Sequence, residues 1–292
     1  MQLVEAWNVL RLTFRVLFTY FRTMSNAFRD FEHAGWESVV AGYDQSFGSL
    51  TTQAIEPLLD SVGAGPGVSL LDVATGPGYV AVAAARRGAI VIGIDFSAPM
   101  VAEAKKKYPS IDFREGDAEA LPFADGSFDA VVMNFGMLHL ARPNQAMSEA
   151  RRVLRAGARF AFTVWAKPVE TAGFGITLGA IPAHGDINVA LPEGPPFFRF
   201  SDWDECARSL LEAGFVDPKV KKIPQTWRLS SADSLFQAMQ TATVRTAGLL
   251  CRQTPQALKR IRGMMANTSR LYENNGVFEL PMPAILASAV KP

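Results

Sequence analysis

The sequence predicts an α/β protein whose central sheet is doubly wound and mostly parallel. Three observations lead to this prediction. Short apolar runs alternate with helical patterns from about residue 68 to 166, as in successive βαβ units. A glycine-rich turn, Thr75-Gly76-Pro77-Gly78, joins the first apolar run to the first helix. An acid, Asp95, ends the second apolar run nineteen residues after Gly76.

The expected elements of this core follow from apolar periodicity and from helix-stop signals such as Gly88 and Pro109. Strands are expected over residues 68–74, 89–94, 111–115, 128–134 and 159–165, and helices over residues 79–87, 98–108 and 144–154. Beyond the core we expect a helix over 202–213, a strand within 216–229, helices over about 231–250 and 255–273, and a last strand within 277–290.

Residues 24–292 are expected to form a single domain with four parts. Residues 24–60 form a helical cap and residues 68–166 form the core that binds a cofactor. Residues 167–200 are rich in Gly, Pro and Phe, and we interpret them as a loop-rich insertion that caps the substrate. Residues 201–292 supply C-terminal helices and strands.

The composition excludes several classes of protein. With 49% apolar and 20% charged residues the chain has ordinary globular composition, and its net charge of +1 gives no basic face for nucleic acid. Two cysteines do not make a disulfide framework, and the three histidines lack metal-ligand spacing, so no metal is expected. The sequence leaves the oligomeric state open.

Residues 1–23 are treated as an extension of uncertain role. Arg11 and Arg15 interrupt its apolar stretch, which is too short and too charged to span a bilayer and does not resemble a secretory signal. An interfacial amphipathic helix with weak membrane association, a helix packed on the domain, and translation from an early start codon stay open as alternatives. We therefore expect a cytoplasmic protein without a membrane span.

The glycine turn and Asp95 together indicate a nucleotide-like ligand. Glycines let the backbone approach a ligand closely, and an acid at the tip of the second strand can accept hydrogen bonds from ribose hydroxyls. The pattern Gly76-x-Gly78-x-x-Ala81 also fits the dinucleotide fingerprint, so a nicotinamide-dependent oxidoreductase is an alternative. Against it, Asp72 would repel a pyrophosphate but suits an ammonium group, and no Tyr-x-x-x-Lys base is present.

Five segments, in order and at family spacing, resemble the class I S-adenosylmethionine-dependent methyltransferases, in particular the branch of ubiquinone and menaquinone C-methyltransferases and many small-molecule methyltransferases. They are Leu71–Gly78, Gly93–Ser97, Gly116–Phe123, Ser127–Val131 and Glu149–Arg155. The resemblance implies a Rossmann-like sheet of seven strands with an antiparallel C-terminal strand. Residues 278–284 are the candidate for that strand, although they contain two prolines.

The resemblance also implies a set of residues that bind S-adenosylmethionine. Asp72, with the backbone of Ala74 and Gly76, would hold the amino acid end, and Asp95 the ribose. The other expected contacts are Phe96 and Met100 beside the adenine, Asp117 and Ala118 at its amino group, Asn134 and Phe135 along the methyl channel, Thr75 and Gly78 in the glycine turn, and Tyr43 in a lid. Two positions depart from the family pattern: Ala74 replaces a glycine, and Ala156-Gly157 replaces Pro-Gly.

Methyl transfer needs alignment, and needs a base only where the nucleophile must lose a proton. His139 and His184 are the candidates for such a base, against the alternatives of a packed histidine and a surface-loop histidine. The apolar segment 174–200 favours a substrate pocket over a small satellite core. We therefore predict methyl transfer to an O, N or C atom of a small apolar or aromatic molecule, with an oxidoreductase or a cofactor-binding protein without methyl transfer as alternatives.

Overall fold

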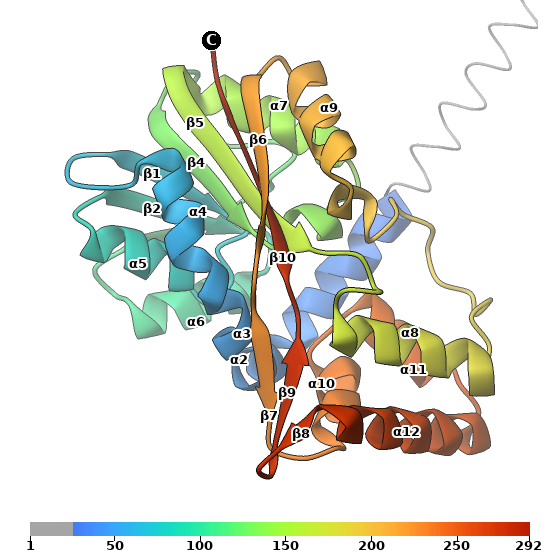
Figure 1. The fold of residues 1–292 in the computed structure, drawn as a ribbon. Helices are drawn as coiled ribbons and strands as arrows, with labels where there is room; N and C mark the ends of the chain where they lie inside the picture. The colour runs from blue at the N-terminus through green and yellow to red at the C-terminus, as the bar shows by residue number, and fades with distance from the viewer. Residues whose placement is uncertain (1–25) are drawn as a thin grey trace, which may run out of the picture.

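The computed structural model describes residues 26–292, so the expectations for residues 1–23 lie outside the described residues. Its main sheet has seven strands in the order β3-β2-β1-β4-β5-β10-β6, and β10 runs antiparallel to both of its neighbours (Figure 1). The strands are β1 (Ser69–Val73), β2 (Ile90–Asp95), β3 (Asp112–Glu115), β4 (Phe128–Asn134), β5 (Leu154–Trp165), β6 (Val216–Ile223) and β10 (Ala284–Val290). The predicted fold class is confirmed.

Reversal of the strand order beside β1 determines where the helices and the site lie. The chain moves from β1 to β2 to β3 in one direction and from β4 to β5 in the other. Because such crossovers are right-handed, α5 (Tyr79–Arg86) and α6 (Ala98–Lys107) cover one face, and α7 (Pro143–Val153) covers the opposite face. The carboxyl ends of β1 and β4 are therefore left open as a crevice, the usual ligand site of such sheets.

The central strands are mostly apolar because both faces of the sheet are covered. In β1 and β4 the side chains of Leu70, Leu71, Val131 and Val132 are fully buried. Asp72 of β1 is the polar exception: its carboxyl group is as fully buried as the neighbouring leucines. A buried acid, Asp72, therefore lies next to the carboxyl end of β1.

The antiparallel strand of the main sheet lies later in the chain than expected. The candidate segment 278–284 instead contributes β9 (Val277–Pro281) to a second sheet of order β7-β9-β8, with β7 (Thr226–Leu229) and β8 (Glu273–Asn274). Pro281 ends β9 and Pro283 precedes β10, so the two prolines separate the sheets. The prediction that residues 278–284 form the final strand of the main sheet was therefore wrong, because β10 (Ala284–Val290) takes that place.

The composition of segment 167–200 predicted a loop-rich insertion, but part of this segment is helical. It contains α8 (Ala172–His184), a helix of 13 residues with Pro182 in its last turn. The helix expected over about 231–250 is in turn broken into α10 (Ser234–Thr241) and α11 (Arg245–Cys251), and α12 (Pro255–Ser269) packs against α8. In Figure 1 these helices lie together beside the small sheet.

The N-terminal cap crosses the carboxyl edge of the main sheet. Residues 26–38 are helical, followed by α2 (Val40–Ser46), α3 (Gly48–Thr51), the short η1 (Thr52–Ala54) and α4 (Ile55–Val62). Lys107 of α6 pairs with Asp44 at 2.7 Å, and Trp227 Nε1 donates to the Ser46 carbonyl at 3.0 Å. The cap is thereby joined both to α6 of the core and to β7 of the small sheet.

Within residues 26–292, no helix is long and apolar enough to cross a membrane.

Candidate active site

A cleft enclosing about 1090 Å³ lies where β1, β2, β4 and β5 end, and part of this space opens to solvent. Ten of the residues predicted from the sequence line it together. They are Tyr43, Ala74, Thr75, Gly76, Asp95, Phe96, Met100, Asn134, Phe135 and His139. Segments that are far apart in the chain therefore meet around one space at the switch point of the sheet.

Asp95 joins the ends of β1 and β2. Its Oδ2 accepts a hydrogen bond from the Gly76 N–H at 2.8 Å, and its Oδ1 accepts from the Ser97 N–H at 3.0 Å. Burial raises the pKa of Asp95 to about 6, although these backbone donors and the charge of His33 oppose the rise. Each oxygen keeps a further lone pair, so the carboxylate can still accept from a ligand hydroxyl.

Asp72 lies beneath the glycine turn and does not line the cleft. Its Oδ2 accepts from Thr75 Oγ1 at 2.5 Å, while its buried Oδ1 has no hydrogen-bond partner among the described residues. Burial raises the pKa of Asp72 to about 7, although the hydrogen bond from Thr75 and the nearby Ala81 N–H oppose the rise. Asp72 was expected to bind the ligand directly, but in the structure it binds Thr75 of the glycine turn. Its Oδ1 can still accept one hydrogen bond.

Two non-glycine residues with left-handed backbone conformation lie at adjacent strand ends. Ala74 follows β1 with φ of 54°, and Phe135 follows β4 with φ of 55°. Such a conformation costs an L-residue about 1 kcal/mol or more. A side chain on Gly136 would clash with the Ala74 methyl group at 2.7 Å, so the two turns are in close contact. Strain at both tips indicates a site whose shape is held by its surroundings.

Asn134 and Phe135 are fixed by contacts with β5. Asn134 Oδ1 accepts from Thr163 Oγ1 at 2.6 Å, and its Nδ2 donates to the Thr51 carbonyl of the cap at 3.2 Å. Phe135 stacks on Trp165 with ring centroids 4.0 Å apart. The amide is therefore held in one orientation at the floor of the cleft.

The wall of the cleft beyond these strand ends is aromatic. Its rings come from the cap, from β5 and from segment 167–200, and they are Trp36, Tyr43, Phe47, Trp165, Phe174 and Phe197. Phe174 contacts Phe197 with centroids 5.5 Å apart. Burial raises the pKa of Tyr43 to about 12, so its hydroxyl stays protonated and donates to Thr51 at 3.2 Å. An apolar, flat ligand suits such a wall.

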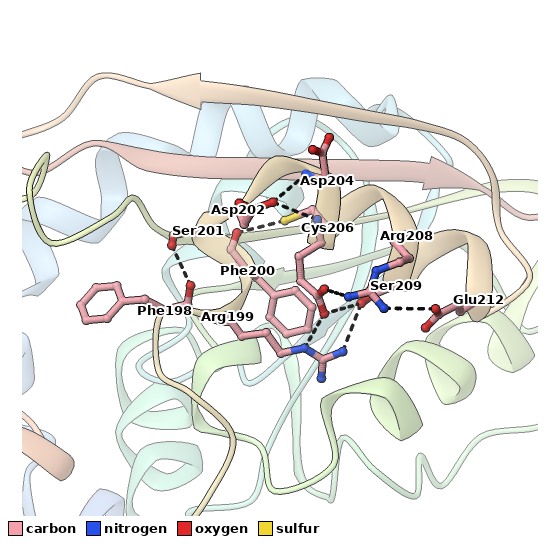
Figure 2. A network of polar contacts seen from close by, with 11 residues as sticks. Phe198, Arg199, Phe200, Ser201, Asp202, Asp204, Cys206, Arg208, Ser209 and Glu212 are labelled. Carbon is pink, nitrogen blue, oxygen red and sulfur yellow. Dashed lines mark hydrogen bonds and ion pairs between the residues drawn. The ribbon is translucent and has the colours of Figure 1, made fainter.

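A polar network holds the segment that carries Phe197. Arg199 donates to Glu205 and Ser209 of α9 (Trp203–Glu212), and Asp202 caps the first turn of that helix. Figure 2 shows Arg199, Asp202 and Ser209 in this network. The Cys206 thiol donates to the Phe200 carbonyl at 3.0 Å. The segment that carries Phe197 is thus attached to α9, which packs against β6 and β10 of the main sheet.

The helix over residues 26–38 covers the cleft on its nucleotide side. His33 Nε2 lies 3.1 Å from the Phe96 carbonyl, and its ring meets the Phe96 ring edge-on. Arg29 pairs at 2.7 Å with Asp117, the residue expected at an adenine amino group. Asp117 and Ala118 do not line the cleft. Asp117 therefore binds the covering helix in this structure.

Two further predicted positions, Gly78 and His184, lie away from the lining of the cleft. Gly78 has φ of 86° and approaches Phe113 so closely that a Cβ would lie 2.8 Å from its ring, so it shapes the turn from below. His184 ends α8 and does not line the cleft, so the structure gives no support for a catalytic role. Among the described residues no cluster of acids, histidines or cysteines could hold a metal ion.

The sequence analysis missed two charged residues beside His139. Glu32, on the covering helix, is fully buried and lies 3.0 Å from His139 Nδ1. Arg245, at the start of α11, donates to Glu32 at 2.7 Å and also lines the cleft. Both come from helices whose polar positions gave no motif, separated from their partners by 107 and 213 residues.

Comparison with known proteins identifies the family. The methyltransferase domain family matches residues 71–162. A demethylmenaquinone methyltransferase of Renibacterium salmoninarum is 33% identical over 175 residues, which cover 57% of this chain and 74% of the relative. The chain belongs to the class I S-adenosylmethionine-dependent methyltransferases. The enzyme of Beutenbergia cavernae with the same name is 44% identical over 110 residues, covering 38% of this chain and 46% of that protein. Within its class, this methyltransferase falls in the quinone methyltransferase branch.

Solved structures agree with the fold of the methyltransferase. Phosphoethanolamine N-methyltransferase 2 of Haemonchus contortus, in complex with S-adenosyl-L-methionine, matches with a TM-score of 0.55 and 19% identity, over 91% of this chain and 60% of that chain. The YcgJ protein of Bacillus subtilis matches with a TM-score of 0.54 and 19% identity, over 82% of this chain and 97% of that chain. The nicotinamide-dependent alternative receives no support from any of these comparisons.

The cofactor of the methyltransferase is S-adenosylmethionine, and the cleft fits it on two observations. The Oδ1 of Asp72 has no hydrogen-bond partner within residues 26–292 and lies below the glycine turn, outside the lining of the cleft, so a carboxyl group beneath the turn favours a cationic group above it. A Cβ on Gly76 would meet no atom within 4 Å, so the backbone leaves open space beside the turn. The strained turns of Ala74 and Phe135 border the same space.

Replacing Asp72 by Asn should change stability in a pH-dependent way. Between about pH 4 and pH 7 the unfolded carboxyl ionises while the buried one stays protonated, because its pKa is raised to about 7. The wild-type protein therefore loses stability over this range. Without cofactor, the free energy of unfolding of Asp72→Asn relative to wild type should rise by about 1 to 3 kcal/mol from pH 4 to pH 8.

Thermal and urea unfolding at several pH values measure this difference. The control is Asp125→Asn, an exposed acid that pairs with Arg152; its difference from wild type should stay nearly flat over the same range. A difference for Asp72→Asn that is equally flat would show that the carboxyl ionises normally in the folded protein.

Proposed function

We propose that this enzyme methylates a hydroquinone, an apolar aromatic ring that carries hydroxyl groups. The observation that carries the proposal is the aromatic wall of the cleft, which adjoins the cofactor turn and has one histidine, His139, at its rim. Flat apolar rings are recognised by such walls, and few polar groups converge here. The relatives named above are demethylmenaquinone methyltransferases, which supports a quinol as the class of substrate.

The proposed cofactor contacts follow from the lining of the cleft. Asp95 would accept from the ribose hydroxyls, and the backbone around Gly76 would approach the amino acid end. Phe96 and Met100 would border the adenine. Asp72 would act from beneath the turn, through its unpartnered oxygen. When bound, S-adenosylmethionine supplies a methyl group that is already activated for in-line displacement.

His139 has the chemistry to start the reaction on the substrate side. Its imidazole would accept the proton of the ring hydroxyl, which leaves the oxygen and the adjacent ring carbon electron-rich. We propose that the carbon forms the new bond to the methyl group, as the methyl–sulfur bond breaks and its electron pair stays on sulfur. The C–H proton at that carbon is then lost to solvent, and the imidazolium of His139 returns its proton to the ring oxygen. The ring thereby regains its aromatic state, and the product is a methylated hydroquinone.

Loss of the Asp95 carboxylate should weaken cofactor binding. Asp95→Ala removes the acceptor for the ribose and the partner of the Gly76 N–H, and a hydrogen bond to a charged group is worth enough to raise the Kd of S-adenosylmethionine roughly 10- to 100-fold. Calorimetric titration measures the change. Asp125→Ala, which removes an exposed acid outside the cleft, should bind like wild type. Equal affinity in Asp95→Ala would contradict the ribose assignment.

The substrate proposal is tested with a short-chain demethylmenaquinol, kept reduced under anaerobic conditions and incubated with enzyme and S-adenosylmethionine. Mass spectrometry should detect a product heavier by one methylene, with its methyl group on ring carbon by NMR. The oxidised quinone should not react, because it carries no hydroxyl proton for a base to remove. Equal turnover of the oxidised form, or methylation of small polar amines in place of the quinol, would refute the proposal.

A further inference from the structure

A buried charge cluster joins the covering helix to the rim of the cleft. Glu32 Oε2 lies 3.0 Å from His139 Nδ1 and accepts from Trp36 Nε1 at 3.1 Å. Glu32 Oε1 accepts from Arg245 Nε at 2.7 Å. Glu32 has no exposed surface, whereas the side chain of His139 keeps 17% and lines the cleft. A fully buried carboxylate is costly unless each oxygen is paired, as both are here.

We propose that Glu32 is a positioning residue, which holds the proton of His139 on Nδ1 and leaves Nε2 as the base that faces the substrate. The inference rests on the proposed function, since it assigns the base of the same reaction. Glu32 itself touches neither substrate nor cofactor. It acts through His139 by fixing the tautomer of the ring and by stabilising the imidazolium that forms when Nε2 takes a proton.

Arg245 makes this role of Glu32 obligatory. A guanidinium has only donors and stays charged, so Oε1 of Glu32 must remain an acceptor. Burial favours the neutral acid, but the charges and hydrogen bonds of His139 and Arg245 hold the pKa of Glu32 below its usual value. Glu32 is therefore ionised, and an ionised carboxylate can only accept from the His139 ring.

Arg245 also ties the cluster to its surroundings. Its remaining donors bind the Leu138 carbonyl at 2.8 Å and the Pro195 carbonyl at 2.7 Å. Its guanidinium lies over the rings of Phe28 and Phe197, at 4.3 and 5.5 Å from their centroids. The cap, the strand end that carries His139, and the insertion thus meet at one cation, which keeps the dyad in a single arrangement.

The position of Glu32 couples the base to coverage of the cofactor site. The same helix carries Arg29, which pairs with Asp117, and His33, which contacts Phe96. When this helix is seated over the nucleotide side of the cleft, Glu32 reaches His139; without it, the histidine loses its partner. The pairing of the base therefore depends on the same helix that contacts Asp117 and Phe96.

Imidazole NMR reads the tautomer directly and needs no substrate. The chain has three histidines, so ¹⁵N-labelled protein and a His139→Gln variant identify the signal of His139. Wild-type protein at a pH where the ring is neutral should carry its proton on Nδ1. Other titratable groups, Asp95 and Tyr43, line the same cleft. Glu32, Trp36 and Phe197 contact the ring of His139, so the signal of His139 itself is the readout.

Glu32→Gln should move that proton. The amide oxygen will face Arg245, because placing the NH₂ group against a guanidinium is the costlier alternative. The NH₂ group then takes the place of Oε2, which leaves the Trp36 N–H without its acceptor. It faces His139 Nδ1, which must become an acceptor, so the proton moves to Nε2. A histidine protonated on Nε2 cannot take the substrate proton there, and kcat with the demethylmenaquinol should fall roughly 100-fold or more. The Kd of S-adenosylmethionine should change far less.

The matched control is Glu37→Gln, on the same helix but with 42% of its side chain exposed. It should leave the His139 tautomer and kcat as in wild type. A wild-type His139 with its proton on Nε2, or an unchanged tautomer in Glu32→Gln, would overturn the proposal. If the quinol is not methylated at all, the proposed function fails, and the NMR result still decides whether Glu32 sets the tautomer.

Discussion

The hydrogen bond from the Gly76 N–H to Asp95 determines the geometry on which the site depends. It joins the ends of β1 and β2, next to the point where the strand order reverses between β1 and β4, so the acid holds the glycine turn in place. Both Asp95 and the neighbouring Asp72 are buried, and burial raises the pKa of each. The edge is therefore short of positive charge and of donors, and a cationic ligand with ribose hydroxyls supplies both.

The other half of the site is made by elements that pack over this edge. The cap reaches Asn134 through the Thr51 carbonyl, and its first helix reaches His139 through Glu32. The insertion supplies Phe174 and Phe197, and the start of α11 supplies Arg245. The core thus provides the glycine turn, the acids and His139, while the cap, the insertion and α11 supply most of the aromatic wall and the partners of that histidine.

The core could be predicted from local patterns, because the signal for a buried parallel strand or an Ala-rich helix lies in consecutive residues. Gly76 and Asp95 could be predicted because they belong to short motifs. The final strand was misplaced because the apolar run around Pro281 and Pro283 is shared by two sheets. Helix α8 was missed because Gly173, Gly175, Gly179 and Pro182 mask its periodicity. Glu32 and Arg245 gave no signal, since only tertiary contacts over more than a hundred residues make them partners of His139.

The most direct test of this account is a crystal structure of the enzyme with S-adenosylhomocysteine and the demethylmenaquinol. The account predicts the ribose on Asp95, the sulfur between the glycine turn and Phe135, the quinol ring against Phe174 and Phe197, and a ring hydroxyl within hydrogen-bond reach of His139 Nε2, with residues 26–38 seated above. A cofactor bound elsewhere, or a quinol whose hydroxyls face away from His139 while its reactive carbon meets the sulfur, would contradict it.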